Sequence, residues 1–352
     1  MKSSNPTSTR TNSRKLRGTG IDATLQIGAI WAIPEILRDL GADPADVCAE
    51  AGIDIALFDD PNNLISFRAA SRLFRVGTER TGCSHFGLLQ GQKYGLKFLG
   101  FVGLLVKYSP DVGSALRSLV RYLHLHIRGA VTKLEVVGKT AMFSYEIYQA
   151  DAEATDQIKD AAVATMYNIM RDLCGPHWDL VEVRLSHRKP ADVAPFRRFF
   201  QAPLLFDADE NALVFFADTL RRPLPEVDPA LRRLLTAQIE ALEQRYSDQF
   251  PEQVRSVLHT ALLTDHARAD QVASIFSMHS RTLHRRLTAA GTSFRELLEE
   301  SRYAIARQML ADTNADVSRV ANVLNYADSS AFTRAFRRWS GTTPAQWRVR
   351  GK

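Results

Sequence analysis

Cysteines and long apolar stretches are scarce in this sequence, and both absences exclude classes of protein. The three cysteines, Cys48, Cys83 and Cys174, lie far apart and form no Cys-x-x-Cys pair. This spacing indicates neither a disulfide framework nor a thiolate metal site, so we expect buried thiols in a reducing cytoplasm. No run of 18 apolar residues occurs, which excludes a transmembrane helix and predicts a cytoplasmic protein without a membrane partner.

Motifs typical of enzymes are also missing. The sequence contains no G-x-S-x-G, no P-loop, no G-x-G-x-x-G and no H-E-x-x-H, the patterns that position a nucleophile, a nucleotide or a catalytic zinc. The adjacent carboxylates Asp59 and Asp60 precede Pro61 and are better explained as a turn. We therefore predict that the protein is not an enzyme and needs no cofactor.

Acidic residues are scarce at both ends of the chain. Residues 1–20 contain five Lys and Arg and no acidic residue, and residues 252–352 contain 15 Lys and Arg against nine Asp and Glu. The segment between them is net acidic, within an overall charge of +6. We interpret residues 1–20 as a disordered basic tail, and the basic carboxy-terminal region favours a polyanionic partner.

The segment 21–225 mixes helical and strand-like patterns and predicts an α+β domain. Apolar residues recur at helical spacing in four stretches, and Gly138-Lys139 is placed to form the turn of a hairpin. Alternating or continuous apolar residues predict two further strands. The helices are expected within 30–40, 66–82, 112–127 and 156–175, the hairpin within 132–148, and the other strands within 179–187 and 212–216.

A proline-rich stretch follows this domain. Residues 221–229 contain three prolines and predict a boundary, after which 230–246 has the apolar spacing of an amphipathic helix. We assign residues 226–250 to a linker helix. Its apolar stripe fits either a dimer seam or packing against the body of the same chain, and the sequence does not separate these alternatives.

The remaining region, 251–352, has apolar residues at helical spacing throughout. Within it, one sequence pattern occurs twice. Residues 271–287 match residues 319–336, with one extra residue in the second turn. Each copy predicts a short helix, a tight polar turn and a second helix, which is a helix-turn-helix unit. The paired apolar positions are Val272 with Val320, Ala273 with Ala321, Ile275 with Val323, Phe276 with Leu324, Met278 with Tyr326, Leu283 with Phe332, and Leu287 with Phe336.

The segment between the two copies fits a long connecting helix. Residues 292–312 begin with Ser293 and Glu296 at the spacing of a capping box. About 20 helical residues span roughly 30 Å, close to the ~34 Å after which the DNA major groove returns to the same face. One chain could therefore place two recognition helices in successive turns of the groove.

The carboxy-terminal region resembles the DNA-binding domain of the AraC/XylS family of bacterial regulators. The resemblance rests on the paired units and on residues 325–348, where an aromatic residue precedes a polar turn and a Gly and a Pro precede a final aromatic-Arg pair. The matching positions are Tyr326, Phe332, Arg334, Phe336, Arg337, Arg338, Gly341, Pro344, Trp347 and Arg348.

The amino-terminal region resembles the arabinose-binding-type sensor domain of the ornithine-utilisation and mycobacterial virulence regulators in the same family. The match extends over about 30–225 and includes His187 to Pro190, Phe200 to Pro203 and Asn211 to Leu213. It implies a domain that senses a small-molecule effector, possible homodimerisation, and activation of transcription through RNA polymerase. A ligand-independent architectural or repressor DNA-binding protein is the alternative.

The outward faces of the two predicted recognition helices carry side chains that read bases and hold phosphates in double-stranded promoter DNA. We predict base contacts from Arg281, Thr282, His284, Arg285, Ser329, Ser330, Thr333 and Arg334. We predict phosphate contacts from Arg337, Arg338 and Arg348. Candidate residues of an effector pocket are Tyr122, His124, Tyr145 and Tyr167.

Two histidine-containing stretches are candidate metal sites. His279 and His284 are five residues apart, so they point in different directions around a helix. His124 and His126 would share one face only in an extended chain, and no carboxylate motif surrounds them. We therefore predict no metal site.

Overall fold

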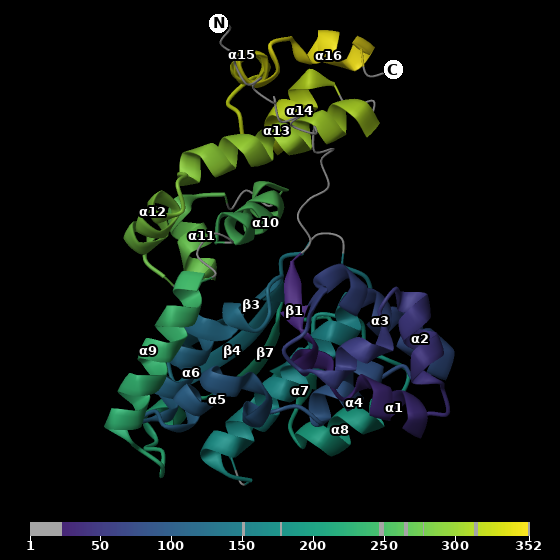
Figure 1. The fold of residues 1–352 in the computed structure, drawn as a ribbon, viewed down its shortest axis with the longest axis vertical. Coiled ribbons are helices and arrows are strands. Elements are labelled where there is room, and N and C mark those ends of the chain that lie inside the picture. The colour runs from purple at the N-terminus through teal and green to yellow at the C-terminus, as the bar shows by residue number, and fades with distance from the viewer. Residues whose placement is uncertain are drawn as a thin grey trace, which may run out of the picture.

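The structure is a computed structural model that describes residues 23–149, 152–176, 178–245, 250–263, 267–276, 278–312 and 316–350. The tail predicted for residues 1–20 lies outside the described residues. An α+β part is followed by a helical part (Figure 1), which confirms the predicted fold class. No helix in the described ranges is long and apolar enough to cross a membrane.

The amino-terminal part is built on a five-stranded sheet with strand order β3-β4-β7-β5-β6. All neighbouring strands are antiparallel except the pair β5 and β6. The predicted hairpin is confirmed, because β3 and β4 pair in register across Gly138-Lys139, and Gly138 adopts a positive φ of 61°. The strands are β3 (Ala130–Val137), β4 (Thr140–Ile147), β5 (Leu180–Arg184), β6 (Leu204–Leu205) and β7 (Asn211–Phe216).

Helices surround this sheet, and a small second sheet pairs β1 (Thr24–Gln26) with β2 (Leu64–Ser66). The predicted helices within 30–40, 66–82, 112–127 and 156–175 are confirmed as α1, α3, α6 and α7, whereas α2, α4, α5 and α8 were not predicted. The bounds are α1 (Ile33–Asp39), α2 (Pro44–Ala51), α3 (Phe67–Thr81), α4 (Phe86–Gln92), α5 (Gly100–Lys107), α6 (Val112–Tyr122), α7 (Thr155–Cys174) and α8 (Ala194–Phe200).

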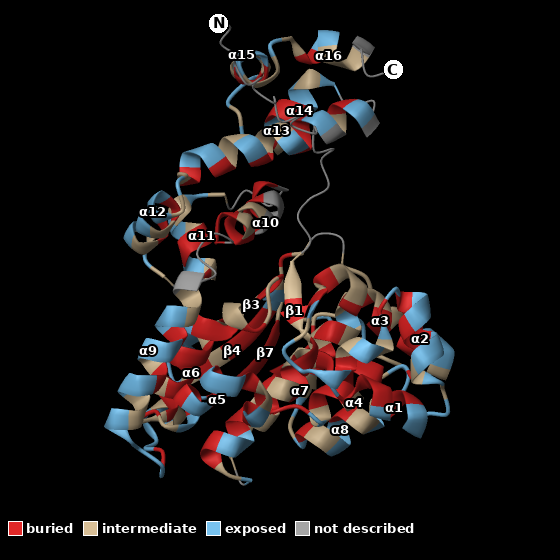
Figure 2. Cartoon of the chain, viewed as in Figure 1, coloured by how far each residue is buried: buried red, intermediate tan, exposed pale blue. Residues whose placement is uncertain are grey.

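Helices α6 and α7 both contact the sheet, and α4 packs along α7. The close approach of α4 requires glycine, because a Cβ on Gly87 would lie 1.9 Å from the carbonyl oxygen of Gln157. A Cβ on Gly91 would lie 2.3 Å from the carbonyl oxygen of Ala161. The buried residues of this part, coloured red in Figure 2, form one continuous core between the helices and the sheet.

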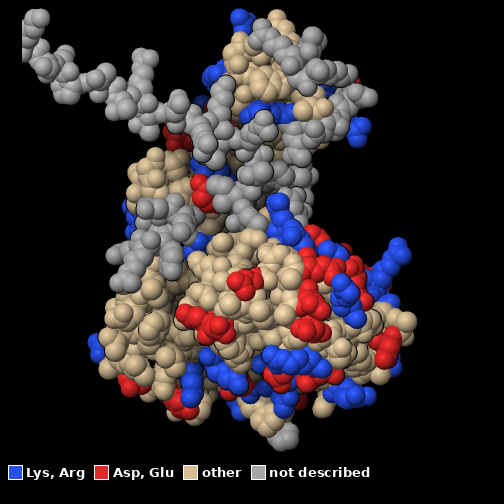
Figure 3. All heavy atoms as spheres, turned by 45° about the vertical axis from the view of Figure 1, so that its right-hand side comes forward, with Lys and Arg blue, Asp and Glu red and all other residues tan. Residues whose placement is uncertain are grey.

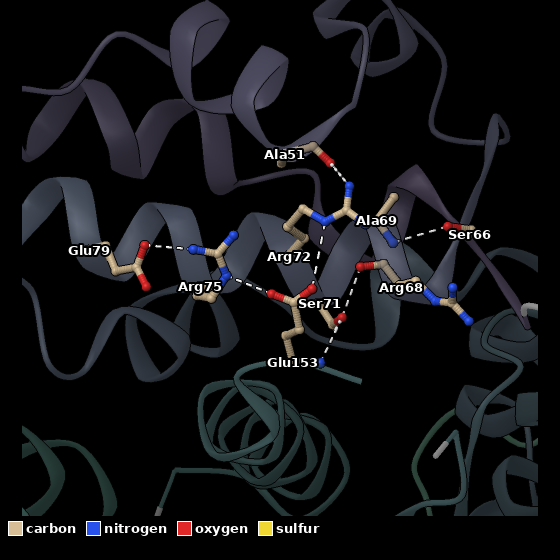
Figure 4. Close-up of polar contacts among 9 residues, drawn as sticks. All are labelled: Ala51, Ser66, Arg68, Ala69, Ser71, Arg72, Arg75, Glu79 and Glu153. Atoms are coloured by element: carbon tan, nitrogen blue, oxygen red, sulfur yellow. Dashed lines mark hydrogen bonds and ion pairs between the residues drawn. The ribbon is translucent and has the colours of Figure 1, made fainter. Parts of the chain in front are cut away.

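A polar cluster joins α3 to the segment that precedes α7 (Figure 4). The Glu153 carboxylate lies 2.6 Å from Nε of Arg75 and 3.7 Å from Nε of Arg72. The backbone N–H of Glu153 also donates to the Ser71 hydroxyl at 3.0 Å. These contacts tie α3 to the segment that leads into α7.

The residues on which the amino-terminal resemblance rests have structural roles. His187 lies at the end of β5 and its Nε2 is 2.9 Å from the buried carboxylate of Asp160 on α7. Burial raises the pKa of Asp160, although the contact with His187 opposes that change. Asn211 accepts from the backbone N–H of Ser186 and donates to its hydroxyl, so both residues fasten the end of β5 to its neighbours.

Helix α9 (Pro229–Arg245) lies along the amino-terminal part and contacts α5. It buries Leu235 and Ile239 in the same core, while Leu234 stays 57% exposed. Of the two alternatives left open by its apolar stripe, packing against the body of the same chain is therefore the one observed.

Seven helices in the described ranges follow α9 and form two small cores. The first core lies among α10, α11, α12 and the start of α13, and the second lies among the end of α13, α14, α15 and α16. Figure 1 shows α13 running between the two groups. The bounds are α10 (Phe250–Leu263), α11 (Ala269–Ile275), α12 (Ser280–Ala289), α13 (Phe294–Asp312), α14 (Val317–Val323), α15 (Ser329–Ser340) and α16 (Pro344–Arg350).

Candidate nucleic-acid interface

Both predicted helix-turn-helix units are present, as α11–α12 and α14–α15. Most of the paired apolar positions of the repeat are buried, and the four anchors on the second helices, Leu283, Leu287, Phe332 and Phe336, are 0% exposed. The exceptions, Ile275, Met278, Val323 and Tyr326, are half-buried. Four residues separate the first pair of helices and five separate the second, which is the single extra residue seen in the sequence. Because these anchors fix one face of α12 and of α15 against its core, the opposite face of each helix is left to solvent.

Side chains cap the starts of α13 and α15. The backbone N–H of Ser293 donates to the Glu296 carboxylate at 2.8 Å, and the N–H of Glu296 donates to the Ser293 hydroxyl at 3.2 Å. The predicted capping box at the start of α13 is therefore confirmed. At the start of α15, Asp328 accepts from the N–H of Ala331 at 2.6 Å, whereas His279 makes no such bond at the start of α12.

Arginines lie on the free faces of both recognition helices. Arg281 and Arg285 on α12 and Arg334 and Arg337 on α15 are exposed. Within the described ranges none of the four forms an ion pair. Arg285 and Arg334 each stand two positions before a buried anchor, so they occupy equivalent places in the two units.

The other predicted DNA contacts are placed less uniformly. His284 and Ser330 are exposed, while Thr282, Ser329 and Thr333 are half-buried. The Thr333 hydroxyl donates to the backbone carbonyl of Ser329 in its own helix at 2.7 Å. Arg338 lies on α15 with Nη2 3.2 Å from the Glu299 carboxylate of α13, and Arg348 is half-buried on α16.

Basic side chains are prominent on the carboxy-terminal helices. On the face shown in Figure 3, blue atoms of Lys and Arg outnumber red atoms of Asp and Glu in the upper part of the molecule, and the lower body carries patches of both signs. This arrangement agrees with the uneven charge of the sequence, and the exposed arginines of α12 and α15 carry positive charge on the recognition helices.

One arginine of α12 points away from the free face. Arg286 is half-buried, its guanidinium lies 4.1 Å from the ring centre of Phe250, and its Nη1 is 3.4 Å from the Glu243 carboxylate at the end of α9. The same carboxylate oxygen lies 3.1 Å from Nε2 of His124, in the loop after α6. Glu243 therefore joins the amino-terminal part to the first recognition helix.

The electrostatics of this junction favour an ionised Glu243. Burial alone would raise the pKa of Glu243, but the contact with His124 and the charges of Arg286 and Arg121 outweigh it and hold this pKa below its usual value. An apolar contact lies nearby, because Tyr148 is buried in the first core and Val131 of β3 packs against it. The second core contains no described residue from the amino-terminal part. The first unit is thus docked on the body of the protein, and the second is joined to it through α10 and α13.

The structure does not bring the four candidate effector residues together. Tyr145 on β4 lines a cavity of about 80 Å³ inside the amino-terminal part. Tyr122 lies near α9, His124 contacts Glu243, and Tyr167 packs against Trp178, Phe199 and Phe200 outside the cavity. Within the described ranges no group of three His, Cys, Asp or Glu side chains could hold a metal ion.

Sequence reasoning missed three residues of these arrangements. Arg286 stands three positions after the buried Leu283, so helical periodicity already indicated that it faces inward. Thr132 lines the cavity on the inward face of β3, where a polar residue alternating with apolar ones was a usable signal. Glu243 carries no local signal, because its partners come from distant segments of the chain.

Comparison with known proteins agrees with this architecture. Residues 41–224, more than half of the chain, match the family described as the arabinose-binding domain of AraC transcription regulators. The chain belongs to this family. Residues 272–350 match a helix-turn-helix domain, and the family resemblance stated from the sequence is therefore confirmed: this is a DNA-binding transcription regulator of the AraC type.

Relatives of similar length are also transcription regulators. The chain is 27% identical to the HTH-type transcriptional regulator VirS of Mycobacterium tuberculosis over 326 residues, covering 92% of this chain and 95% of VirS. It is 26% identical to the ornithine utilization regulator of Pseudomonas aeruginosa, covering 90% and 94%. The crystal structure of the regulator CdpR from P. aeruginosa matches with a TM-score of 0.45 and 22% identity over 90% of this chain and 96% of that one.

Proposed function

We propose that the protein regulates transcription by reading two successive major-groove segments of promoter DNA with α12 and α15, under the control of a small molecule sensed by its amino-terminal part. The observation that carries this proposal is the equivalence of Arg285 and Arg334. Each is exposed and unpaired within the described ranges, on a helix whose opposite face is held by two fully buried anchors. An exposed arginine in that position can bind guanine through two hydrogen bonds.

The remaining assignments follow from what each side chain is free to do. Arg281, Thr282, His284, Ser329 and Ser330 would share in base contacts, and Arg337 would contact phosphate. Thr333 would have to break its bond to Ser329, and Arg338 would have to leave Glu299, so we expect smaller contributions from both. Arg348 is half-buried on α16 and is assigned to the phosphate backbone.

Control by an effector is supported by the way in which the first unit is docked. The Glu243 junction and the contact of Tyr148 with the first core connect α12 to the amino-terminal part. An effector that binds one arrangement of this junction more tightly than another would shift the population that is competent to bind DNA. From the family resemblance we further propose that the protein activates transcription through RNA polymerase. From the sequence we propose that it dimerises through residues 21–245 and is not an enzyme.

The experiment is operator footprinting of the full chain on genomic promoter DNA, followed by affinity measurements at fixed salt. Arg285→Ala should weaken binding to the specific site by about 1–3 kcal/mol and change binding to random DNA little. Arg337→Ala should weaken both and lower the slope of log affinity against log salt by about 1.

The matched control is Arg233→Ala, which removes the same charge from an exposed position on α9. It should leave both affinities within a factor of two to three of the unchanged protein, since long-range charge effects are screened. Equal losses for Arg233→Ala and Arg285→Ala would show that net charge, and not base contact, accounts for the effect. An effector-independent footprint would favour the architectural or repressor alternative.

A further inference from the structure

The cavity in the amino-terminal part has a lining that selects one kind of ligand. It lies between α3, α7 and the inward face of β3 and β4, and none of its lining side chains carries a formal charge. Phenylalanine, leucine, isoleucine and alanine side chains provide most of the surface. The domain is named after a sugar, but a sugar needs hydrogen-bond partners around its whole ring, and few polar groups face this cavity.

Most of the polar side chains in the lining already have partners within the protein. Gln90 donates to the carbonyl of Ala29 at 2.7 Å, and the Thr165 hydroxyl donates to the carbonyl of Ala161 at 2.8 Å. The Tyr94 hydroxyl contacts Nε2 of His126. Each of these side chains is therefore already engaged by another group of the protein, and a polar ligand would have to compete with that existing contact.

Two residues with hydroxyl groups remain in the lining, and they lie opposite each other across the hairpin. Thr132 on β3 and Tyr145 on β4 are directly paired in the register of the hairpin. Thr132 is 4% exposed and its hydroxyl has no hydrogen-bond partner. Tyr145 is 5% exposed and lines the same cavity. A buried hydroxyl without a partner costs free energy, and a ligand that supplied a polar atom here would recover it.

We propose that this cavity binds an uncharged, mainly apolar molecule no larger than one aromatic ring, whose single hydroxyl or carbonyl group meets the Thr132 hydroxyl beside Tyr145. The absence of lining charges excludes an ionised ligand, because burying an unpaired ion is very costly. The volume of about 80 Å³ is about half that of an apolar cavity of about 150 Å³ that holds benzene, so one ring is the upper limit of ligand size and fits only if the lining side chains move apart. The rings of Phe67, Phe74 and Phe143 offer edges and faces to such a molecule.

The position of the cavity links the ligand to DNA binding, and in this respect the inference rests on the proposed function. Leu123 and Ile127 line the cavity on either side of His124 along the chain. His124 contacts Glu243, which contacts Arg286 next to the DNA-facing Arg285. A shift of the short segment 123–127 on ligand binding would therefore act on the junction directly.

The test is calorimetric titration of the purified full chain with four probes in the absence of DNA: phenol, toluene, benzoate and L-arabinose. We expect saturable binding of phenol, weaker binding of toluene, and no binding of benzoate or arabinose. Thr132→Val removes only the hydroxyl and should weaken phenol binding about three- to tenfold while leaving toluene unchanged. Ala70→Met fills the cavity and should abolish binding of both.

The matched control is Tyr167→Phe, which removes a hydroxyl outside the cavity and should leave phenol affinity unchanged. If Ala70→Met does not fold, the phenol affinities of Thr132→Val and Tyr167→Phe are compared, and a loss in Thr132→Val alone supports the inference. Binding of arabinose or benzoate, no binding of phenol, or equal phenol affinity in all variants overturns the inference. A parallel gel shift with promoter DNA distinguishes failure of this inference from failure of the proposed function. A chain that binds promoter DNA but none of the probes refutes only the proposed ligand class.

Discussion

Replacing Glu243 by Gln removes the negative charge that joins α9, His124 and Arg286 while keeping the size of the side chain. The side chains of Glu243 and Arg286 are 16% and 25% exposed. Exposed ion pairs contribute up to about 1 kcal/mol, and breaking a fully buried pair costs about 3–5 kcal/mol. A pair at this depth should therefore contribute about 1–2 kcal/mol to the docking of the first helix-turn-helix unit on the body.

Hydrogen exchange measured by mass spectrometry would detect this change. A loss of 1–2 kcal/mol raises the open population about 5- to 30-fold, so amides in α12 and at the end of α9 should exchange faster by that factor. Exchange in α14 and α15 should not change, because the second core contains no described residue of the amino-terminal part. Glu240→Gln, on the exposed face of the same helix, is the control.

Two further measurements test whether the ion pair between Glu243 and Arg286 holds the first unit on the body. Arg286→Ala should accelerate exchange at least as much as Glu243→Gln, because it also removes the contact with Phe250. The double variant should change exchange by less than the sum of the two single effects, because both variants remove the same ion pair. Since the pKa of Glu243 is held below 4.5 in the folded protein, its contribution should be complete above pH 4.5 and disappear as the pH falls through the lowered value. Unchanged exchange in Glu243→Gln, or equal acceleration in Glu240→Gln, would refute the junction.

Three other substitutions test the packing that positions the interface. Gly91→Ala should lower the free energy of unfolding by about 1–3 kcal/mol in a thermal melt, because its Cβ would meet the carbonyl oxygen of Ala161 at 2.3 Å. Leu287→Ala, at a fully buried anchor, should cost about 2–5 kcal/mol and accelerate exchange in α11–α12 but not in α14–α15; acceleration in both units would contradict two separate cores. Asp328→Ala should cost about 1 kcal/mol through loss of the cap of α15, whereas His279→Ala at the uncapped equivalent should cost little.

Much of the interface could be predicted from local sequence because its causes are local. Helical periodicity places Leu283, Leu287, Phe332 and Phe336 on inward faces, and the internal repeat shows that the same arrangement occurs twice. The capping box at Ser293 and Glu296 and the hairpin turn at Gly138 depend on residues within a few positions of one another. For such features the sequence is sufficient, since the interacting groups are brought together by the element itself.

The sequence alone determined the fold class, the two helix-turn-helix units and the exposed arginines, because periodicity and turn chemistry act within one or two elements. Only the tertiary structure decided that Arg285 is free while its neighbour Arg286 is held by Glu243, and that Tyr145, but not Tyr122 or Tyr167, faces a cavity. These outcomes depend on contacts between segments about 25 to 120 residues apart in the chain, and no local pattern specifies which distant side chains a fold will place together.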